Sequence, residues 1–334
     1  MAARSPEPAK RWAFPQSASA LVAGRCRLRK SSRISIAALM RPAGFIGPYA
    51  TRLENWGSPV ATVYPTGPAV VLDIRCSIAE QVEWLRREAP DYLLTFGVNL
   101  LFLARHCRDH GVVLPSLRGV RSSGEVLSEE ARAVCREAWG VEVVDMYSSV
   151  ETGYIAFQCP EFPHYHVQSE SALVEVIDER GQPCRAGEVG QVVITPLHNF
   201  AMPLIRYAIG DFAEVGEACP CGRTLPVLRR ILGRTRDMLA LPSGEKRFPY
   251  YGQKALAGFG AIIQHQIVQR SLQEIEIRLV ARRRLTPDEE ERLRTTVLSG
   301  LGHPFHVAFT YVDEIAREKG GKFAEFRCEV RSGD

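Results

Sequence analysis

The stretch LRGVRSSGEVLSEEARAVCREAWGVEVVDMYSSVE, residues 117–151, decides the fold class. Its first part is a short apolar strand that runs into a turn of small residues, RSSGE. Ser128 then suits the N-cap of a helix, because its hydroxyl can accept a backbone N–H of the first turn, and Gly140 suits the position after the last turn. The apolar residues of VEVVDMYSS indicate a second strand. This stretch therefore predicts strand, helix and strand.

Two upstream segments repeat the pattern. The run AVVLDI, residues 69–74, is typical of a buried strand, and Ser77 with Glu80 forms a capping box that begins a helix. DYLLTF, residues 91–96, indicates the next strand, followed by a helix over about 98–110. Strands and helices that alternate at this spacing predict an α/β fold, with a parallel sheet covered by helices. Ligands of such sheets bind beyond the carboxyl ends of the strands, where RSSGE and MYSSVE lie.

The pattern changes after Leu173. LVEVID and GQVVIT, at 173–178 and 190–195, predict a hairpin, and PLIRY and FAEVG, at 203–207 and 212–216, predict further short strands. These segments predict a small antiparallel β unit over residues 170–216.

The last hundred residues predict a second domain. AIIQHQIV and the alternating EIEIRLV indicate two strands, Thr286 with Glu289 forms a second capping box, and FHVAFTYV alternates like a strand. Strand, strand, helix and strand within this length indicate a compact α+β domain. We therefore divide the chain into a leader (1–60), a large domain (61–236) and a C-terminal domain (237–334).

Composition excludes some classes. Of the 334 residues, 46% are hydrophobic, but no run reaches the roughly 20 apolar residues of a membrane-spanning helix. Residues 1–50 hold nine Lys and Arg against the single acid Glu7, so the basic excess is confined to the leader and does not predict nucleic-acid binding. The leader fits a presequence, a disordered arm or an upstream stretch that is not translated.

Cysteine usage points to the cytoplasm and to a metal. Nine cysteines, an odd number in a large chain, favour a reducing compartment. Cys159 and His166 in CPEFPHYH, with Cys219 and Cys221 in CPCG, make a set of three sulfurs and one imidazole that suits structural zinc. His164 is the alternative nitrogen ligand, and four unrelated side chains are the alternative interpretation.

Five stretches in chain order resemble one family. They are SSGE (122–125), DMYSSVE (145–151), AMPLIRYAIGD (201–211), CPCGRTLPVLRRILGRTRDML (219–239) and GGKFAEF (320–326). Over residues 60–330 the chain resembles the phenylacetate-CoA ligase branch of the adenylate-forming acyl-CoA synthetases. The resemblance implies that a small carboxylic acid attacks the ATP α-phosphate to give an acyl-adenylate, which the thiol of coenzyme A then cleaves.

The resemblance also assigns nucleotide contacts. Tyr147 would stack on adenine, Glu151 would bind the magnesium ion that bridges the phosphates, and Asp211 would accept hydrogen bonds from the ribose hydroxyls. Arg234 would reach the ribose or the α-phosphate, and Arg206 would anchor its turn or face the phosphate. Val150 stands where the family has a threonine.

The remaining assignments complete the nucleotide site and add the hinge. Ser148 would also contact the nucleotide, while Ser123, Gly124 and Glu125 would form the other wall of the adenine slot. Lys322 would meet the carboxylate and phosphate during adenylation.

Arg236 would be the hinge about which the C-terminal domain rotates between the two half-reactions.

A further departure from the family pattern keeps other functions open. The sequence holds no Ser/Thr/Gly-rich phosphate loop upstream of these motifs, so we expect an incomplete large domain whose apolar sheet edge favours self-association. A non-catalytic protein that binds a nucleotide or a partner, or an adenylyltransferase that acts on another acceptor, are the alternatives to an acyl- or aryl-CoA ligase.

Overall fold

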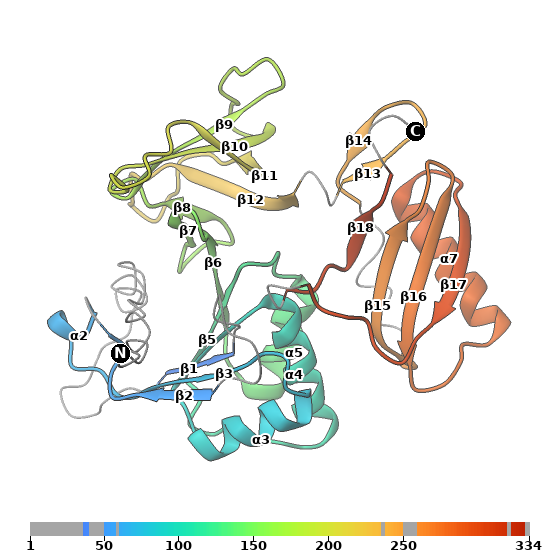
Figure 1. Cartoon of the computed structure of the whole chain (residues 1–334), viewed down its shortest axis with the longest axis horizontal. Coiled ribbons are helices and arrows are strands. Elements are labelled where there is room, and N and C mark those ends of the chain that lie inside the picture. Colours follow the sequence, from blue (N-terminus) through green and yellow to red (C-terminus); the bar gives the residue numbers. More distant parts are fainter. Residues whose placement is uncertain are drawn as a thin grey trace, which may run out of the picture.

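Twelve of the described strands form one hydrogen-bonded sheet (Figure 1), in the order β2-β3-β1-β4-β5-β6-β7-β8-β12-β11-β10-β9. The computed structural model describes residues 36–39, 50–57, 60–234, 238–249, 259–318 and 322–330. The first strands are β1 (Ile36–Leu39), β2 (Ala50–Leu53), β3 (Ala69–Leu72), β4 (Tyr92–Thr95), β5 (Gly119–Ser123) and β6 (Val143–Ser149). Strands β3, β1, β4, β5 and β6 pair in parallel, which confirms the predicted α/β class.

Helices cover this parallel part, and their ends follow the sequence signals. They are α2 (Val60–Val63), α3 (Ile78–Glu88), α4 (Gly97–Asp109) and α5 (Glu129–Trp139). Ser77 and Glu80 form both hydrogen bonds of the capping box of α3, and the hydroxyl of Ser128 accepts the backbone N–H of Ala131 at α5. Gly140 ends α5 in the left-handed conformation that glycine adopts without strain.

The central strand β1 was not predicted. It lies between β3 and β4, and all four of its residues are buried. Ala37 packs into the core beneath the helices, whereas Ala38 packs on the opposite face with Trp56 and Met146. Small residues suit a strand that is covered on both faces, but alanine has low intrinsic strand preference.

The antiparallel strands are continuous with the parallel sheet, so the predicted boundary of the β unit at 170–216 is too narrow. They are β7 (Gly153–Gln158), β8 (Tyr165–Val167), β9 (Ala172–Ile177), β10 (Val189–Pro196), β11 (Tyr207–Val215) and β12 (Val227–Arg234). Strand β7 pairs with β6 and so joins the two regions. The segment PLIRY is not a separate strand, since β11 begins only at Tyr207 and includes FAEV.

The described residues from 238 onwards, which we call the C-terminal unit, form their own sheets. They contain β13 (Leu239–Ala240), β14 (Lys246–Arg247), β15 (Ile262–Gln269), β16 (Glu274–Ala281), α7 (Pro287–Leu301), β17 (His306–Tyr311) and β18 (Phe326–Cys328). Thr286 and Glu289 cap α7 as predicted. The four-stranded sheet β17-β16-β15-β18 packs on α7, with β18 an addition that the sequence did not indicate.

In the part of the chain that the structure describes, no helix combines the length and the apolar character needed to cross a membrane. The described sheet ends at β2 on one side and at β9 on the other. Self-association through one of these edges stays a prediction.

We expect Leu100→Ala to lower the free energy of unfolding by about 2–5 kcal/mol, because the side chain in α4 is fully buried and its removal leaves a cavity. Leu173→Ala is the matched control, since Leu173 is 54% exposed. Denaturant unfolding of both variants measures the difference. Equal losses at the two positions would contradict the described packing of α4.

Candidate functional site

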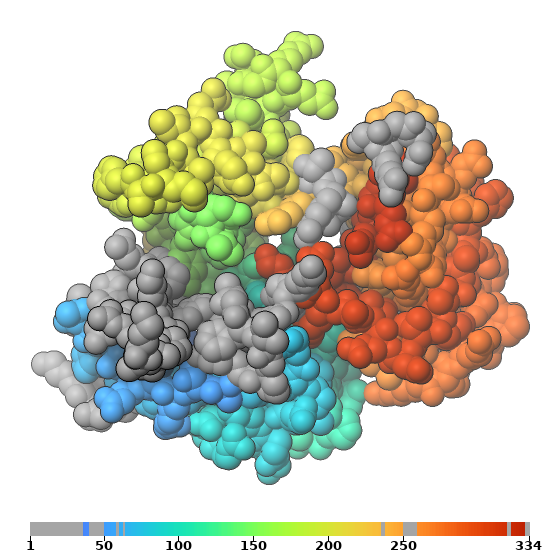
Figure 2. Space-filling view, in the orientation of Figure 1, coloured from blue at the N-terminus to red at the C-terminus, as the bar shows by residue number. Residues whose placement is uncertain are grey.

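A cavity of about 240 Å³ lies between the large sheet and the C-terminal unit. Figure 2 shows the hollow between the yellow β9–β12 strands and the orange and red C-terminal unit. Residues of both parts line it: Val98, Gly124, Glu125, Val126, Asp145, Met146, Tyr147, Ser148, Tyr165, Asp211, Ile231, Leu232, Gly233, Arg234, Phe248, Pro249, Glu318, Lys322, Phe323, Ala324, Glu325 and Phe326. Six predicted nucleotide-site residues and Lys322 are therefore brought to one place.

One wall is built around the buried carboxylate of Asp211. The Tyr147 hydroxyl donates to Asp211 Oδ2 at 2.8 Å, and Arg234 Nε donates to Asp211 Oδ1 at 3.1 Å. Burial, with the neighbouring carboxylate, raises the pKa of Tyr147 above its ordinary value, so the phenol stays protonated and acts as the donor. Each Asp211 oxygen keeps a second lone pair that can accept a ligand hydroxyl.

Strand pairing explains why these distant residues meet. Asp211 on β11 lies opposite Arg234 on β12 in the antiparallel register, and Tyr147 comes from β6, where the parallel region ends. Gly210 has φ +84°, a conformation that a residue with a side chain rarely adopts. Gly210 thus allows the backbone to adopt this conformation directly before Asp211.

The opposite wall brings Lys322 close to the SSGE turn. Gly124 has φ +79°, and a Cβ built there would lie 3.4 Å from Lys322 Cε and 3.1 Å from the Phe96 ring. The positive φ and the nearby Phe96 ring therefore favour glycine at position 124, and they place the turn in contact with Lys322.

Glu125 joins the two parts of the chain. Its Oε2 accepts the backbone N–H of Val98 at 2.9 Å, and its Oε1 accepts that of Phe323 at 2.7 Å. Burial of the carboxyl group raises its pKa to about 7, although both N–H groups and the nearby Arg317 favour the charged form. The sequence predicted Glu125 as a nucleotide contact and gave no sign of this bridge.

Among the lining residues that the sequence analysis did not assign are Asp145 and Tyr165. The Tyr165 hydroxyl donates to Asp145 Oδ2 at 2.6 Å, and Asp145 Oδ1 is buried without a hydrogen-bond partner among the described residues. Burial raises the pKa of Asp145. Its place in DMYSSVE, two residues before Tyr147 on the same strand face, was the available signal.

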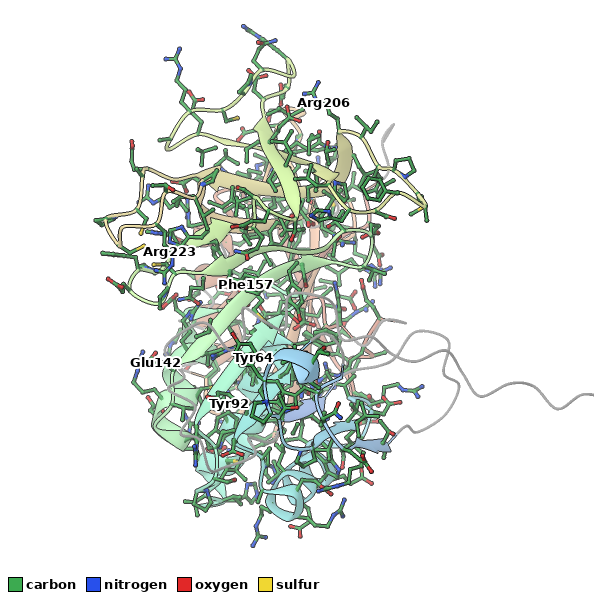
Figure 3. All side chains as sticks on the ribbon, turned by 90° about the vertical axis from the view of Figure 1, so that its left-hand side faces the viewer. Tyr64, Tyr92, Glu142, Phe157, Arg206 and Arg223 are labelled. Carbon is green, nitrogen blue, oxygen red and sulfur yellow. The ribbon has the colours of Figure 1, made fainter. Side chains whose placement is uncertain are left out.

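Other predicted residues do not line this cavity. The exposed Glu151 lies in the β6–β7 turn beside Val150, and Ser123 at the end of β5 also lies outside the lining. Their predicted contacts stay predictions. Arg206 projects from the outer end of the antiparallel strands (Figure 3), where it pairs with Glu175 at 3.2 Å, so it anchors its turn rather than facing the cavity. Arg236 falls outside the described residues.

The cysteines and histidines predicted to hold zinc gather around β8 and the β11–β12 loop. Ligand atoms of Cys159, His164, His166 and Cys219 all lie within 4.8 Å of one another. Cys221 Sγ lies 3.4 Å from His166 Nε2, and the Cys221 backbone N–H points at Cys219 Sγ at 3.4 Å. The structure thus brings together all four predicted ligands and the alternative His164.

This Cys/His cluster fits a metal chemically. Its sulfurs and imidazoles are the ligands zinc prefers, and buried His164 Nε2 and His166 Nδ1 find no hydrogen-bond partner in the described part of the chain. Arg223, at the edge of the molecule in Figure 3, donates to Cys221 Sγ at 3.4 Å. Because neighbours along a strand point to opposite faces, Tyr165 reaches the cavity while His166 joins the cluster.

Known proteins share parts of this sequence. A family model described as the CapK C-terminal domain matches residues 252–326. A phenylacetate-coenzyme A ligase of Thermus thermophilus is 34% identical over 188 residues, 53% of this chain and 42% of the relative. That of Pseudomonas putida is 27% identical over 179 residues, 51% of this chain and 39% of the relative. The matches thus span about two fifths of the length of these curated relatives.

Solved structures share the fold. A 2-hydroxyisobutyryl-CoA ligase described as in the postadenylation state has a TM-score of 0.68 at 22% identity, over 90% of this chain and 66% of that one. The anthranilate CoA ligase AuaEII, in complex with anthranoyl-AMP, has a TM-score of 0.61 at 17% identity, over 87% and 58%. The chain is therefore a relative of the phenylacetate-CoA ligases with the fold of adenylate-forming CoA ligases, which confirms the resemblance predicted from its motifs.

Proposed function

We propose that this chain activates a small carboxylic acid with ATP and passes the acyl group to coenzyme A. In the first half-reaction a carboxylate oxygen bonds to the α-phosphorus, and the bond to the bridging oxygen of pyrophosphate breaks. In the second, a thiolate attacks the acyl carbon and AMP leaves. Both steps move negative charge between phosphate and carboxylate oxygens, so they require fixed positive groups beside a bound nucleotide.

The observation that carries the proposal is the position of Lys322 in the same cavity as Tyr147, Asp211 and Arg234. The Asp211 oxygens suit a ribose diol, and Arg234, which Asp211 holds at the cavity, places a positive charge beside a bound phosphate. Lys322 adds a cation from the C-terminal unit. A nucleotide bound between them would place its α-phosphate between two positive groups.

The cavity floor offers purine recognition. The ring of Tyr147 lines it as a stacking surface, and buried Asp145 Oδ1 can accept an exocyclic amino group. An adenine would thus bring a further donor to this buried carboxylate.

The placement of the C-terminal unit supports the first half-reaction as the state described here. TM-scores to the 2-hydroxyisobutyryl-CoA ligase are 0.68 and 0.69 for structures described as postadenylation states and 0.50 for one in the thioesterification state. In this proposal the C-terminal unit closes over the nucleotide during adenylation and moves for thioester formation, with the hinge at Arg236.

A protein that binds nucleotide without turning it over is the second candidate. It is favoured by Glu151, the predicted magnesium ligand, which is exposed and outside the cavity lining. For the ligase, Glu151 is the residue that would hold a magnesium ion, which would neutralise charge on the ATP phosphates.

We also propose structural zinc in the Cys/His cluster and a reducing, cytoplasmic location. Cys159, His166 and Cys219 belong both to the predicted ligand set and to the tightest spatial group, with Cys221 or His164 as the fourth ligand. The eight described cysteines are all free thiols. A zinc ion bound there by four protein ligands would tie β7 and β8 to the β11–β12 loop and add stability without taking part in the reaction.

We expect Lys322→Ala to reduce acid-dependent ATP–pyrophosphate exchange by about 100-fold or more, because it removes a cation from the site where charge develops. The assay uses wild type with a panel of aryl and alkyl acids. Lys246→Ala, at an exposed position in β14, is the matched control. Equal exchange in wild type and Lys322→Ala would remove Lys322 from adenylation, and no exchange with any acid would favour the non-catalytic candidate.

We expect Asp211→Asn to weaken AMP binding by about tenfold or more, because the neutral amide loses charge-assisted bonds to Arg234 and to ribose. Calorimetric titration of AMP measures this without requiring turnover. Asp288→Asn, at an exposed position in α7, should bind AMP as wild type does. Unchanged binding in Asp211→Asn would place the nucleotide elsewhere.

For the Cys/His cluster we expect one zinc ion per chain, lost in Cys219→Ser and retained in Cys184→Ser, which lies outside the cluster. Zinc loss should also lower the melting temperature, because bound metal stabilises the folded state. Cys221→Ser and His164→Gln compared by metal analysis identify the fourth ligand. A wild-type protein purified without chelator that carries no zinc would refute the metal.

A further inference from the structure

A single carboxylate ties the C-terminal unit to the first turn of α4. Glu125 accepts the N–H of Val98, the second residue of α4, which has no partner inside its own helix. Its other oxygen accepts the N–H of Phe323, which directly follows Lys322. The bond to Phe323 fixes the peptide unit that joins it to Lys322.

A second buried polar contact lies beside the first. Arg317 Nη2 donates to Asn99 Oδ1 at 2.8 Å, and Asn99 is fully buried. The amide of Asn99 is oriented from the other side, since its Nδ2 donates to Gln81 Oε1 at 2.8 Å and to Thr95 Oγ1 at 3.2 Å. Helix α4 and the turn after β5 therefore present two oriented acceptors, Asn99 and Glu125, and the C-terminal unit supplies a donor to each.

An apolar contact surrounds these bonds. Val98, Ile315 and Phe323 are buried together, and the rings of Phe102 and Phe323 meet edge to face at 6.1 Å. Apolar contacts favour closure but do not specify one register, because they are non-directional. The hydrogen bonds at Glu125 and Asn99 are directional, so they specify one arrangement of the two parts.

We propose that Glu125, supported by Asn99, is a positioning residue that holds the C-terminal unit in the arrangement in which Lys322 reaches the nucleotide cavity. This inference rests on the proposed adenylation but gives Glu125 a different role from the nucleotide contact that the sequence suggests. Both bonds join the two parts of the chain, so they exist only while the unit is closed. Weakening them lowers the population of the closed arrangement and leaves the chemistry of the second half-reaction unaltered.

The experiment compares Glu125→Gln and Arg317→Met with wild type and with Glu83→Gln, an exposed control on α3. Glutamine keeps the size of Glu125 but offers one acceptor oxygen, and Arg317→Met alters the C-terminal unit while leaving the N-terminus of α4 intact. Hydrogen–deuterium exchange reports on the Phe323 amide. ATP–pyrophosphate exchange measures adenylation, and thioester formation from supplied acyl-adenylate and coenzyme A measures the second step.

We expect Glu125→Gln to raise the exchange rate of the Phe323 amide and to lower kcat for adenylation, each by about tenfold or more, because a charge-assisted bond is lost. The KM for ATP should rise by a smaller factor than kcat falls, since Glu125 acts through Lys322, and Asp211 can still hold the nucleotide in the open arrangement. Thioester formation from the adenylate should match wild type. Arg317→Met should show the same pattern, and Glu83→Gln should show none of it.

Three results would overturn the proposal. An unchanged Phe323 exchange rate in Glu125→Gln and Arg317→Met would show that these residues do not hold the C-terminal unit closed, whatever activity the chain has. A raised KM for ATP with unchanged kcat would indicate that Glu125 contacts the nucleotide directly, as the sequence suggested. Parallel loss of both half-reactions would indicate general destabilisation. If wild type catalyses neither half-reaction, the proposed function fails. The exchange rate of the Phe323 amide alone then tests whether Glu125 holds the C-terminal unit in place.

Discussion

The buried carboxylate of Asp211 is the constraint on which both the sheet and the candidate site depend. A charge removed from water is costly unless donors replace the lost hydration, and Tyr147 and Arg234 supply them from two other strands. The ends of β6 and β12 are therefore held against the middle of β11. Because Asp211 also lines the cavity, the interaction that aligns these strands also orients a carboxylate that can accept hydrogen bonds from a ligand.

Local signals in the sequence predicted α3, α4, α5 and α7 but not the short α2 or every strand. The capping boxes at Ser77 and Thr286 lie within four residues of chain, so each bond is encoded where it forms. Strand β1 has no such signal, because its sequence IAAL owes its conformation to β3 and β4, which pair with it from both sides. The same holds for β18, whose pairing with β15 joins residues almost 60 positions apart. Burial between partners, not propensity, makes these segments strands.

The site divides in the same way. Motifs placed Tyr147, Asp211, Arg234 and Lys322 in one family pattern, and the cavity brings those four together. What the motifs did not reveal is which atoms each side chain satisfies in this chain. Glu125 lies 198 residues from Phe323, and no spacing rule connects a carboxylate to a backbone N–H at that distance. Asp145 was likewise overlooked, because an acid inside a strand motif shows its burial only after the strands pair.

The cavity is shared between two parts of the chain, so binding and closure are linked. A nucleotide that contacts Asp211 on the large sheet and Lys322 on the C-terminal unit gains its full set of contacts only in the closed arrangement, and it must therefore favour closure by its difference in affinity. The Glu125 bond to Phe323 acts in the same direction without touching the ligand. Too strong a contact would hold the unit closed after the first step. A single shared carboxylate and one arginine within a small apolar contact are consistent with an interface that can also open.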